Sequence, residues 1–153
     1  MKKLDIVKAN STDSQELTKL TIKSKAIWGF SVKQLEKWKD ELTISQEYIE
    51  NNHVYKLLRE QQIVAYYSYI QLNKKIVKLD NLFVHPDHIK KGCGTILLND
   101  LLEKVMNSSF EKIILDSEPK AKEFYEKFDF EITGKTASSI PNRFLIQMEK
   151  KLK

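Results

Sequence analysis

Residues 89–94 have the composition of an anion-binding loop. They read Ile-Lys-Lys-Gly-Cys-Gly, between an apolar strand pattern and a helical pattern that begins at Thr95. The glycines Gly92 and Gly94 allow left-handed backbone and the close approach of a phosphate. The N–H groups at the start of a helix attract the same ligand, and the two lysines add full positive charges. The pattern therefore favours a pyrophosphate group as the ligand.

Two common nucleotide loops do not fit this segment. No Lys-Ser or Lys-Thr pair follows the second glycine, which excludes a Walker loop, and the three glycines of a dinucleotide fingerprint are missing. A plain turn from strand to helix that needs glycine for its geometry remains an alternative.

The elements that position this loop follow from the hydrophobic patterns. We expect a first third that is mainly helical, an antiparallel meander of three strands, and then helix, strand, helix and two strands, which is an α+β fold with a mixed, mostly antiparallel central sheet flanked by helices. Parity changes in the third meander strand, which predicts a β-bulge near Asp80 and Asn81. The expected strands cover residues 4–9, 54–58, 63–72, 76–84, 112–116, 132–136 and 144–148. The expected helices begin after Asn10, at Ser31, at Ser45, at Thr95 and at Pro119, the first of them ending near Trp28.

Two stretches together resemble the GCN5-related N-acetyltransferase family. His85-Pro86, the loop at 89–94 and the aliphatic helix behind it are similar to the family's motif A. Residues 121–130, which read Ala-Lys-Glu-Phe-Tyr-Glu-Lys-Phe-Asp-Phe, are similar to its motif B. The chain departs from the pattern at Ile89, where Gln or Arg is usual, and at Lys90 and Asp129, where Gly is frequent or usual.

The resemblance implies an acyl-CoA N-acyltransferase-like fold in one domain over residues 1–153. It also implies acetyl-CoA as co-substrate and direct transfer of the acetyl group to a primary amine, and it places the thioester beside residues 82–84. The implied cofactor-binding residues are Leu82, Phe83, Val84, Ile89, Lys90, Lys91, Gly92, Cys93, Gly94, Thr95, Ala121 and Phe124.

Transfer from a thioester to an amine needs a neutral amine, stabilisation of the developing oxyanion and a proton for the departing thiolate. Tyr125 matches the motif B tyrosine, and its phenol, with an ordinary pKa near 10, is predicted to be the catalytic acid. Packing in the core is the alternative for Tyr125. Asp80 and His85 are candidate bases, although a surface carboxylate and a packed histidine are the simpler interpretations, and a chain of water molecules could serve equally well.

Three further residues have both a functional and a structural interpretation. Cys93 is expected to fill space in the loop, because direct transfer needs no nucleophile. Trp28 and Phe30 could hold a flat or apolar acceptor, or pack with Trp38 against the sheet. Arg143, in the segment 139–143, could meet an acidic acceptor, but a solvated surface position is the expectation.

Composition limits the class of protein. The 153 residues include 26 Lys and Arg, 21 Asp and Glu, and one cysteine. The single cysteine argues against a disulfide or a cysteine zinc site, and we expect no metal. Neither a membrane span nor a signal peptide is visible, which predicts a cytoplasmic protein, a monomer or homodimer, that does not bind a membrane.

Two alternatives to an acetyltransferase remain open. The first is a regulatory module that binds CoA without turnover. The second is a basic nucleic-acid-binding domain, which the net charge of +5 permits. The lysines are scattered among acidic residues, so nucleic acid is not an expected partner.

Overall fold

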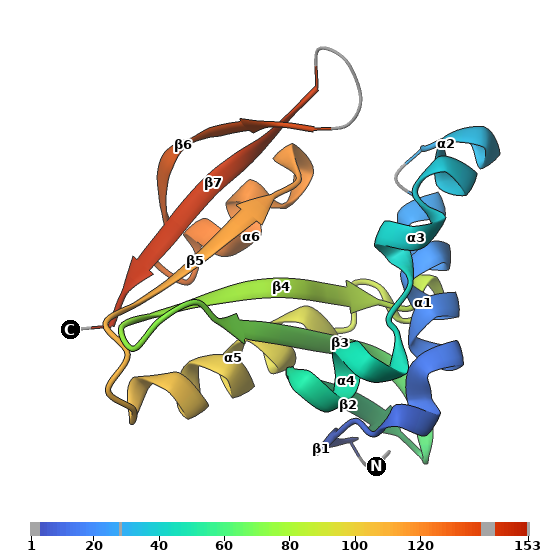
Figure 1. Cartoon of the computed structure of the whole chain (residues 1–153), viewed down its shortest axis with the longest axis horizontal. Helices are drawn as coiled ribbons and strands as arrows, with labels where there is room; N and C mark the ends of the chain where they lie inside the picture. Colours follow the sequence, from blue (N-terminus) through green and yellow to red (C-terminus); the bar gives the residue numbers. More distant parts are fainter. Residues whose placement is uncertain (1–3, 28, 139–142, 153) are drawn as a thin grey trace. The chain divides into compact units, whose positions relative to one another are not determined.

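A computed structural model of the chain describes residues 4–27, 29–138 and 143–152 (Figure 1). The strands are β1 (Leu4–Lys8), β2 (His53–Arg59), β3 (Gln62–Gln71), β4 (Ile76–Val84), β5 (Lys112–Ser117), β6 (Glu131–Ala137) and β7 (Phe144–Lys151). The helices are α1 (Ser14–Ala26), α2 (Val32–Lys37), α3 (Lys39–Leu42), α4 (Gln46–Asn51), α5 (Cys93–Met106) and α6 (Lys122–Glu126). Short 3₁₀ turns occupy Ser11–Asp13, Pro86–His88 and Pro119–Ala121.

The strands of the described residues follow the order β1-β2-β3-β4-β5-β7-β6. β1 and β2, β2 and β3, β5 and β7, and β6 and β7 pair antiparallel, while β4 and β5 pair parallel. This confirms the expected α+β class with a mixed, mostly antiparallel sheet flanked by helices. No helix within the described residues is long and apolar enough to cross a membrane.

The chain forms two compact units, and β4 and α5 contribute residues to both. The first unit comprises Met1–Tyr69 with Asn81–Leu101, and the second comprises Ile70–Asp80 with Leu102–Lys153.

The first unit has apolar packing on both faces of its strands. Because successive side chains of a strand point to opposite faces, Tyr66 and Tyr67 face different helices. Tyr66 joins the core cluster with Leu17 of α1 and Ile49 of α4, whereas the Tyr67 hydroxyl donates a hydrogen bond of 2.6 Å to Asp100 of α5. The α5 residues Leu97, Leu98 and Leu101 are fully buried. Helices α1 and α4 thus cover one face and α5 covers the other.

The short helices of the first unit begin at the expected capping residues. The Ser31 hydroxyl accepts the Gln34 N–H at the start of α2, and the Ser45 hydroxyl accepts the Tyr48 N–H at the start of α4, each at 3.0 Å. Such caps satisfy donors that have no partner inside the helix. The predicted helix starts at Ser31 and Ser45 are confirmed.

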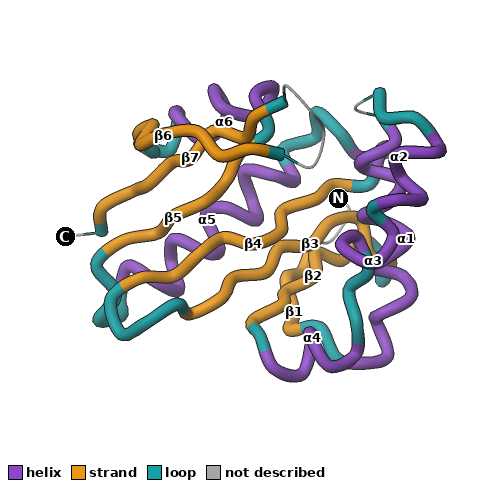
Figure 2. The backbone as a smooth tube through the Cα atoms, turned by 45° about the horizontal axis from the view of Figure 1, so that its top comes forward, coloured by secondary structure: helices purple, strands orange, loops and turns teal. Residues whose placement is uncertain are grey.

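The second unit is built on the hairpin of β6 and β7, with β5 alongside β7 (Figure 2). Met148 of β7 pairs with Leu115 of β5 on one side and with Ile132 of β6 on the other. The core of this unit includes Ile113, Leu115 and Met148. Tyr125 of α6 is also buried and contacts the Phe130 ring with 5.8 Å between centroids.

Two residues at positions where the resemblance implies glycine have left-handed backbone. Lys90 has φ of 64° and Asp129 has φ of 68°. An L-residue in this conformation is less stable by roughly 1–2 kcal/mol, less for Asp than for most, while Gly adopts it freely. Lys90 and Asp129 therefore have the backbone conformation that glycine would adopt, with the strain that this conformation causes in an L-residue.

We expect Asp129→Gly to raise the free energy of unfolding by about 1 kcal/mol relative to Asp129→Ala, since only glycine relieves the strain. The Lys150–Asp129 contact, at 3.9 Å with an exposed carboxylate, contributes little and is lost in both variants. Urea unfolding followed by circular dichroism measures the difference.

The exposed α6 residue Glu123 supplies the control. Within a helix the order reverses, so Glu123→Ala is expected to be more stable than Glu123→Gly. The same order at both positions would contradict the role assigned to the left-handed backbone.

Candidate functional site

A hydrogen bond joins the end of β4 to β3 just before the loop begins. The His85 N–H donates to the Val64 carbonyl at 2.8 Å, and the His85 Nδ1 accepts the Asp87 N–H at 3.1 Å, which caps the 3₁₀ turn Pro86–His88. Since one ring nitrogen of His85 is used for this cap, the ring has a structural role in starting the loop.

The loop enters α5 through two left-handed residues, Lys90 and Gly92, with φ of 64° and 80°. The Ile96 N–H donates to the Gly92 carbonyl at 3.0 Å, so α5 begins at Cys93. The N–H groups of residues 93–95 then lie in the first turn, where intrahelical acceptors are lacking. This is the arrangement that binds an anion.

The structure corrects two details of the sequence prediction. The helix begins at Cys93 rather than Thr95, because Gly92 already ends the loop. Gly94 therefore lies in the helical first turn, and Lys90 occupies the second left-handed position that was expected at Gly94.

Space, charge and an unpaired polar atom at this loop fit a phosphate group. A Cβ added to Gly92 would meet no atom within 4 Å, so the backbone there is open to a ligand. Within the described residues, the buried His88 Nδ1 has no hydrogen-bond partner. Burial lowers the pKa of His88, and the positive charges of Lys91 and Arg59 lower it further. Arg59 thus adds to the positive potential of the loop.

Cys93 lies at this helix start as a buried thiol, 3% exposed. Burial raises the pKa of Cys93, and the nearby charges of Arg59 and Lys91 oppose that shift. A thiol whose pKa is raised carries little thiolate at neutral pH and is a poor nucleophile.

The remaining predicted residues of this region differ in exposure. Leu82, Phe83 and Val84 are half-buried at the end of β4. Gly94 is half-buried, while the side of the loop formed by Ile89, Lys90, Lys91, Gly92 and Thr95 is exposed.

A polar cluster precedes residues 82–84 on β4. The Asn81 amide donates to the Ser68 hydroxyl at 2.9 Å, and the Ser68 and Tyr48 hydroxyls are 2.9 Å apart. Ser68 is fully buried, so these hydrogen bonds satisfy groups that water cannot reach. They hold the strand where it reaches the proposed thioester position.

Tyr125 and its neighbours belong to the second unit. Tyr125 is 9% exposed and packs edge-on against Phe124, with 5.1 Å between ring centroids. Burial raises the pKa of Tyr125 above its ordinary value of 10.0. Among the described residues, none hydrogen-bonds to its hydroxyl. Ala121 and Phe124 are half-buried in the same segment. The phenol is thus protonated at neutral pH, as an acid must be.

Other predicted residues take structural or surface positions. Asp80 is exposed. The expectation for Arg143 was wrong, because its guanidinium forms an ion pair with Glu118 and is 20% exposed rather than solvated. Trp28 and the segment 139–142 lie outside the described residues.

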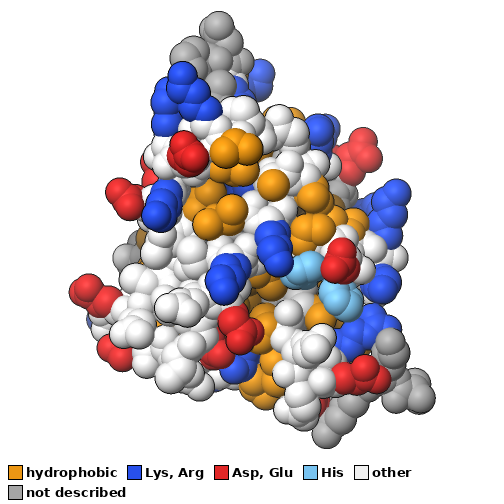
Figure 3. Space-filling model, turned by 90° about the vertical axis from the view of Figure 1, so that its right-hand side faces the viewer, with side chains coloured by type: hydrophobic (Ala, Val, Ile, Leu, Met, Phe, Trp, Pro, Cys, Tyr) orange, Lys and Arg blue, Asp and Glu red, His pale blue; other side chains and the backbone are white. Residues whose placement is uncertain are grey.

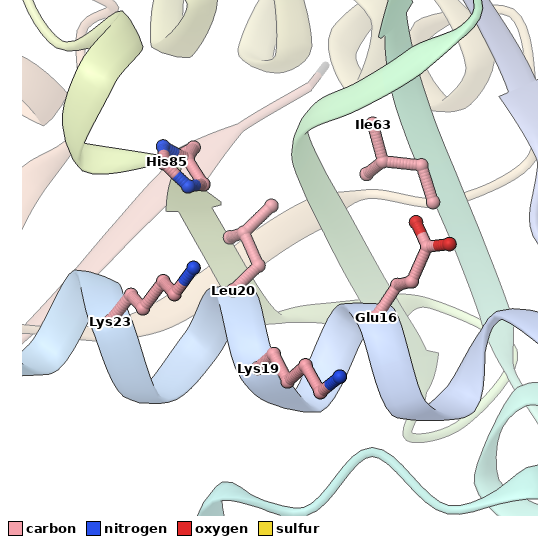
Figure 4. A pocket seen from close by; sticks show the side chains of 6 residues that line it. All are labelled: Glu16, Lys19, Leu20, Lys23, Ile63 and His85. Carbon is pink, nitrogen blue, oxygen red and sulfur yellow. The ribbon is translucent and has the colours of Figure 1, made fainter.

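An open pocket lies beside His85 in the first unit. Glu16, Lys19, Leu20 and Lys23 of α1 form one side, and Ile63 and His85 lie opposite (Figure 4). The face in Figure 3 shows apolar side chains next to histidine, with basic side chains flanking them.

Comparison with known families assigns the chain. The model of the acetyltransferase (GNAT) domain matches residues 10–152. The chain belongs to the GNAT acetyltransferase family. Acetyl-CoA is therefore its co-substrate. Comparison with curated protein sequences finds no match.

Several solved GNAT structures share the fold. PaiA N-acetyltransferase from Thermoplasma acidophilum, in complex with coenzyme A, is 18% identical, with 97% of this chain and 99% of that chain covered and a TM-score of 0.82. The ribosomal-protein-S18-alanine N-acetyltransferase of Escherichia coli is 18% identical, with 98% and 94% covered and a TM-score of 0.75. YncA from Salmonella typhimurium, solved with acetyl-CoA, is 16% identical, with 98% and 94% covered and a TM-score of 0.70.

The sequence analysis did not predict a role for Arg59 as a charge near the loop or for Lys25 as a cation beside aromatic rings. Arg59 is the last residue of β2, and its effect on His88 and Cys93 depends on strand pairing that no local pattern predicts. Lys25 lies in the last turn of α1 with its ammonium near three aromatic rings. Two of the rings beside Lys25, those of Phe30 and Trp38, were predicted to pack together, but no sequence pattern placed a lysine beside them.

The loop assignment predicts that Gly92→Trp weakens CoA binding at least about tenfold, because the indole fills the open space beside the helix start. Titration calorimetry with CoA measures the change.

Gly29→Trp is a matched control. Gly29 also has positive φ, 89°, and open space around an added Cβ, so the substitution introduces the same strain away from the loop. Equal CoA affinities for the two variants would contradict the assignment of the loop.

Proposed function

We propose that the chain is an N-acetyltransferase that moves an acetyl group from acetyl-CoA directly to a primary amine. The observation that carries the proposal is the loop at 89–94, which combines left-handed backbone, an exposed helix start and the charges of Lys91 and Arg59. Membership of the GNAT family supports acetyl transfer from acetyl-CoA. The amine acceptor and the roles of the individual residues are part of the proposal.

In this proposal the loop binds the pyrophosphate of the co-substrate. The N–H groups of the first turn of α5 are donors, Lys90 and Lys91 add charge, and Gly92 leaves room for the phosphates. Backbone donors do not depend on side-chain identity, so the departure at Ile89 leaves this interaction intact.

The proposed thioester position lies beside residues 82–84. The parallel register between β4 and β5 ends at Lys78 and Ile114. Backbone groups not used in pairing with β5 would be available to the pantetheine arm and, through one N–H, to the oxyanion. The polar cluster of Tyr48, Ser68 and Asn81 keeps the strand in place.

Tyr125 is the proposed acid for the departing thiolate. Its phenol is protonated over the physiological range because burial raises its pKa above 10.0. Its donor is not used by another described residue. A simple thiol has an ordinary pKa near 8.5, so the phenol in water would not readily protonate the thiolate. Because burial also raises the pKa of Tyr125, the transfer is favourable only where desolvation raises the pKa of the CoA thiol above that of the phenol.

The alternative, a CoA-binding module without turnover, is separated from the enzyme by one experiment. Calorimetry with acetyl-CoA, and with dephospho-CoA as a comparison, measures the co-substrate site, and thiol release in the presence of a panel of primary amines measures transfer. Amine-dependent thiol release supports the enzyme. Tight binding with no release from any amine would favour the regulatory module.

Tyr125→Phe is expected to lower kcat by about 10²-fold or more, the size of a general-acid contribution, and to leave CoA affinity nearly unchanged. Removing the hydroxyl leaves the ring contacts with Phe124 and Phe130 in place. Phe130→Leu, which disturbs the same packing and keeps the phenol, is the control. An unchanged rate in Tyr125→Phe would exclude the acid role.

Cys93→Ala is expected to keep transfer within about threefold, since direct transfer passes through no acetylated cysteine. The buried thiol, with its raised pKa, supports this expectation. Steady-state kinetics with both substrates varied should give intersecting lines. Parallel lines together with loss of activity in Cys93→Ala would indicate an acetyl-enzyme and contradict direct transfer.

A further inference from the structure

The ammonium group of Lys25 lies among three aromatic rings of the first unit. Its Nζ is 5.7 Å from the centroid of Phe30, 5.9 Å from that of Trp38 and 5.7 Å from that of Phe83. The rings come from three places in the chain, namely the turn after α1, the junction of α2 and α3, and β4. We call Phe30, Trp38 and Phe83 the aromatic cage.

The rings of the cage are held in place by packing. Phe30 and Trp38 meet edge to face, with 4.8 Å between centroids and 71° between planes. The ring centroids of Phe83 and Tyr66 are 5.9 Å apart. The Tyr66 hydroxyl forms a hydrogen bond with Thr21 of α1. Gly29, with φ of 89°, forms the turn that leads to Phe30. The cage is therefore preorganised for a cation.

The residues around the cage differ in burial. Trp38 is buried at 7% exposure, while Phe30, Phe83 and Lys25 are half-buried. An ammonium within about 6 Å of an aromatic centroid is attracted by the ring quadrupole, and the attraction strengthens as water is excluded. A group that reaches this place from solvent would meet the same three rings as Lys25 does.

We propose that the aromatic cage recognises an alkylammonium group of the acceptor and that Lys25 occupies the cage when no acceptor is bound. The inference rests on the proposed function, because Phe83 belongs to the segment beside which the thioester is expected. It names the acceptor class as a small aliphatic amine that carries a second amino group. One amino group, neutral, takes the acetyl group, and the other stays protonated in the cage.

Lys25 and the acceptor compete in this arrangement. Both are primary alkylammonium groups, so the side chain must leave the rings before the acceptor can bind. The side chain is tethered to the last turn of α1, and its effective concentration at the cage lowers the apparent affinity of a free ligand. Removing the lysine side chain should therefore expose a cation site.

The binding test measures the affinity for choline and for its neutral isostere 3,3-dimethylbutan-1-ol by titration calorimetry in the absence of acetyl-CoA. We expect Lys25→Ala to bind choline about tenfold more tightly than the unaltered chain, and Lys25→Ala/Phe30→Leu to lose that gain. The neutral alcohol should show no such gain. Lys37→Ala, at an exposed lysine in the last turn of α2, controls for lost charge.

Two results would overturn the inference. One is equal choline affinity for Lys25→Ala and Lys25→Ala/Phe30→Leu, and the other is an equal gain for the neutral alcohol. If the double variant fails to fold, as judged by circular dichroism, Lys25→Ala/Phe83→Leu tests the same cage from β4.

A kinetic test separates this inference from the proposed function. Thiol release is compared for 1,5-diaminopentane and 5-aminopentan-1-ol, which have the same chain length and differ in the second charge. We expect kcat/KM about tenfold higher for the diamine, with the ratio falling toward one in Phe30→Leu.

The two hypotheses fail in different ways. Equal kcat/KM for both amines would overturn the cage as an acceptor site and leave acetyl transfer established. No thiol release with any amine, together with cation binding by Lys25→Ala, would overturn the proposed function and leave the cage as a cation site.

Discussion

The proposed interactions with acetyl-CoA depend on the fixed direction of α5. Its first turn can bind phosphates only if the helix is held against the strands of the first unit, and Leu97, Leu98 and Leu101 are fully buried there. Their burial contributes several kcal/mol, and the hydrogen bond from Tyr67 to Asp100 adds direction to that packing. The other groups of the loop can act on the phosphates only because this packing fixes the position of the helix start.

At two positions where the expected motifs have glycine, this chain has another residue in the left-handed backbone conformation. Lys90 and Asp129 stand where glycine is frequent or usual in the family, and both have positive φ. At Lys90 the loop gains a positive charge beside the proposed pyrophosphate in return for the strain. The exposed Asp129 offers no comparable gain, and its carboxylate is 3.9 Å from the Lys150 ammonium. Both residues therefore keep a backbone conformation that glycine would adopt.

Local patterns were sufficient for most elements. β4 was predicted at its observed bounds because β-branched and aromatic residues occur at both of its ends and a polar turn precedes it. The start of α5 was placed two residues late, since glycine and cysteine are weak helix formers and the hydrogen bond from Ile96 to Gly92 is invisible in a sequence. The predicted bulge near Asp80 and Asn81 stays a prediction.

Long-range contacts could not be predicted in the same way. Arg59 reaches the loop through strand pairing, and the ion pair of Arg143 with Glu118 joins residues that are distant in sequence. The aromatic cage brings together three rings from three places in the chain, and only Phe30 and Trp38 were expected to pack as aromatics. Side-chain contacts between distant residues follow from tertiary packing, which composition and periodicity do not specify.

Aromatic recognition of a cation suits a protein that must also bind phosphates. A carboxylate placed beside the acceptor would attract an amine, but it would also repel the anionic co-substrate and, in a site shielded from water, would do so strongly. Rings attract a cation through their quadrupole, whose field falls off faster than that of a charge. Phe30, Trp38 and Phe83 could therefore select a protonated amine while Lys90, Lys91 and Arg59 keep the loop positive. Lys25, which lies over the three rings, would keep apolar ligands away from them until the alkylammonium group of the acceptor replaces it.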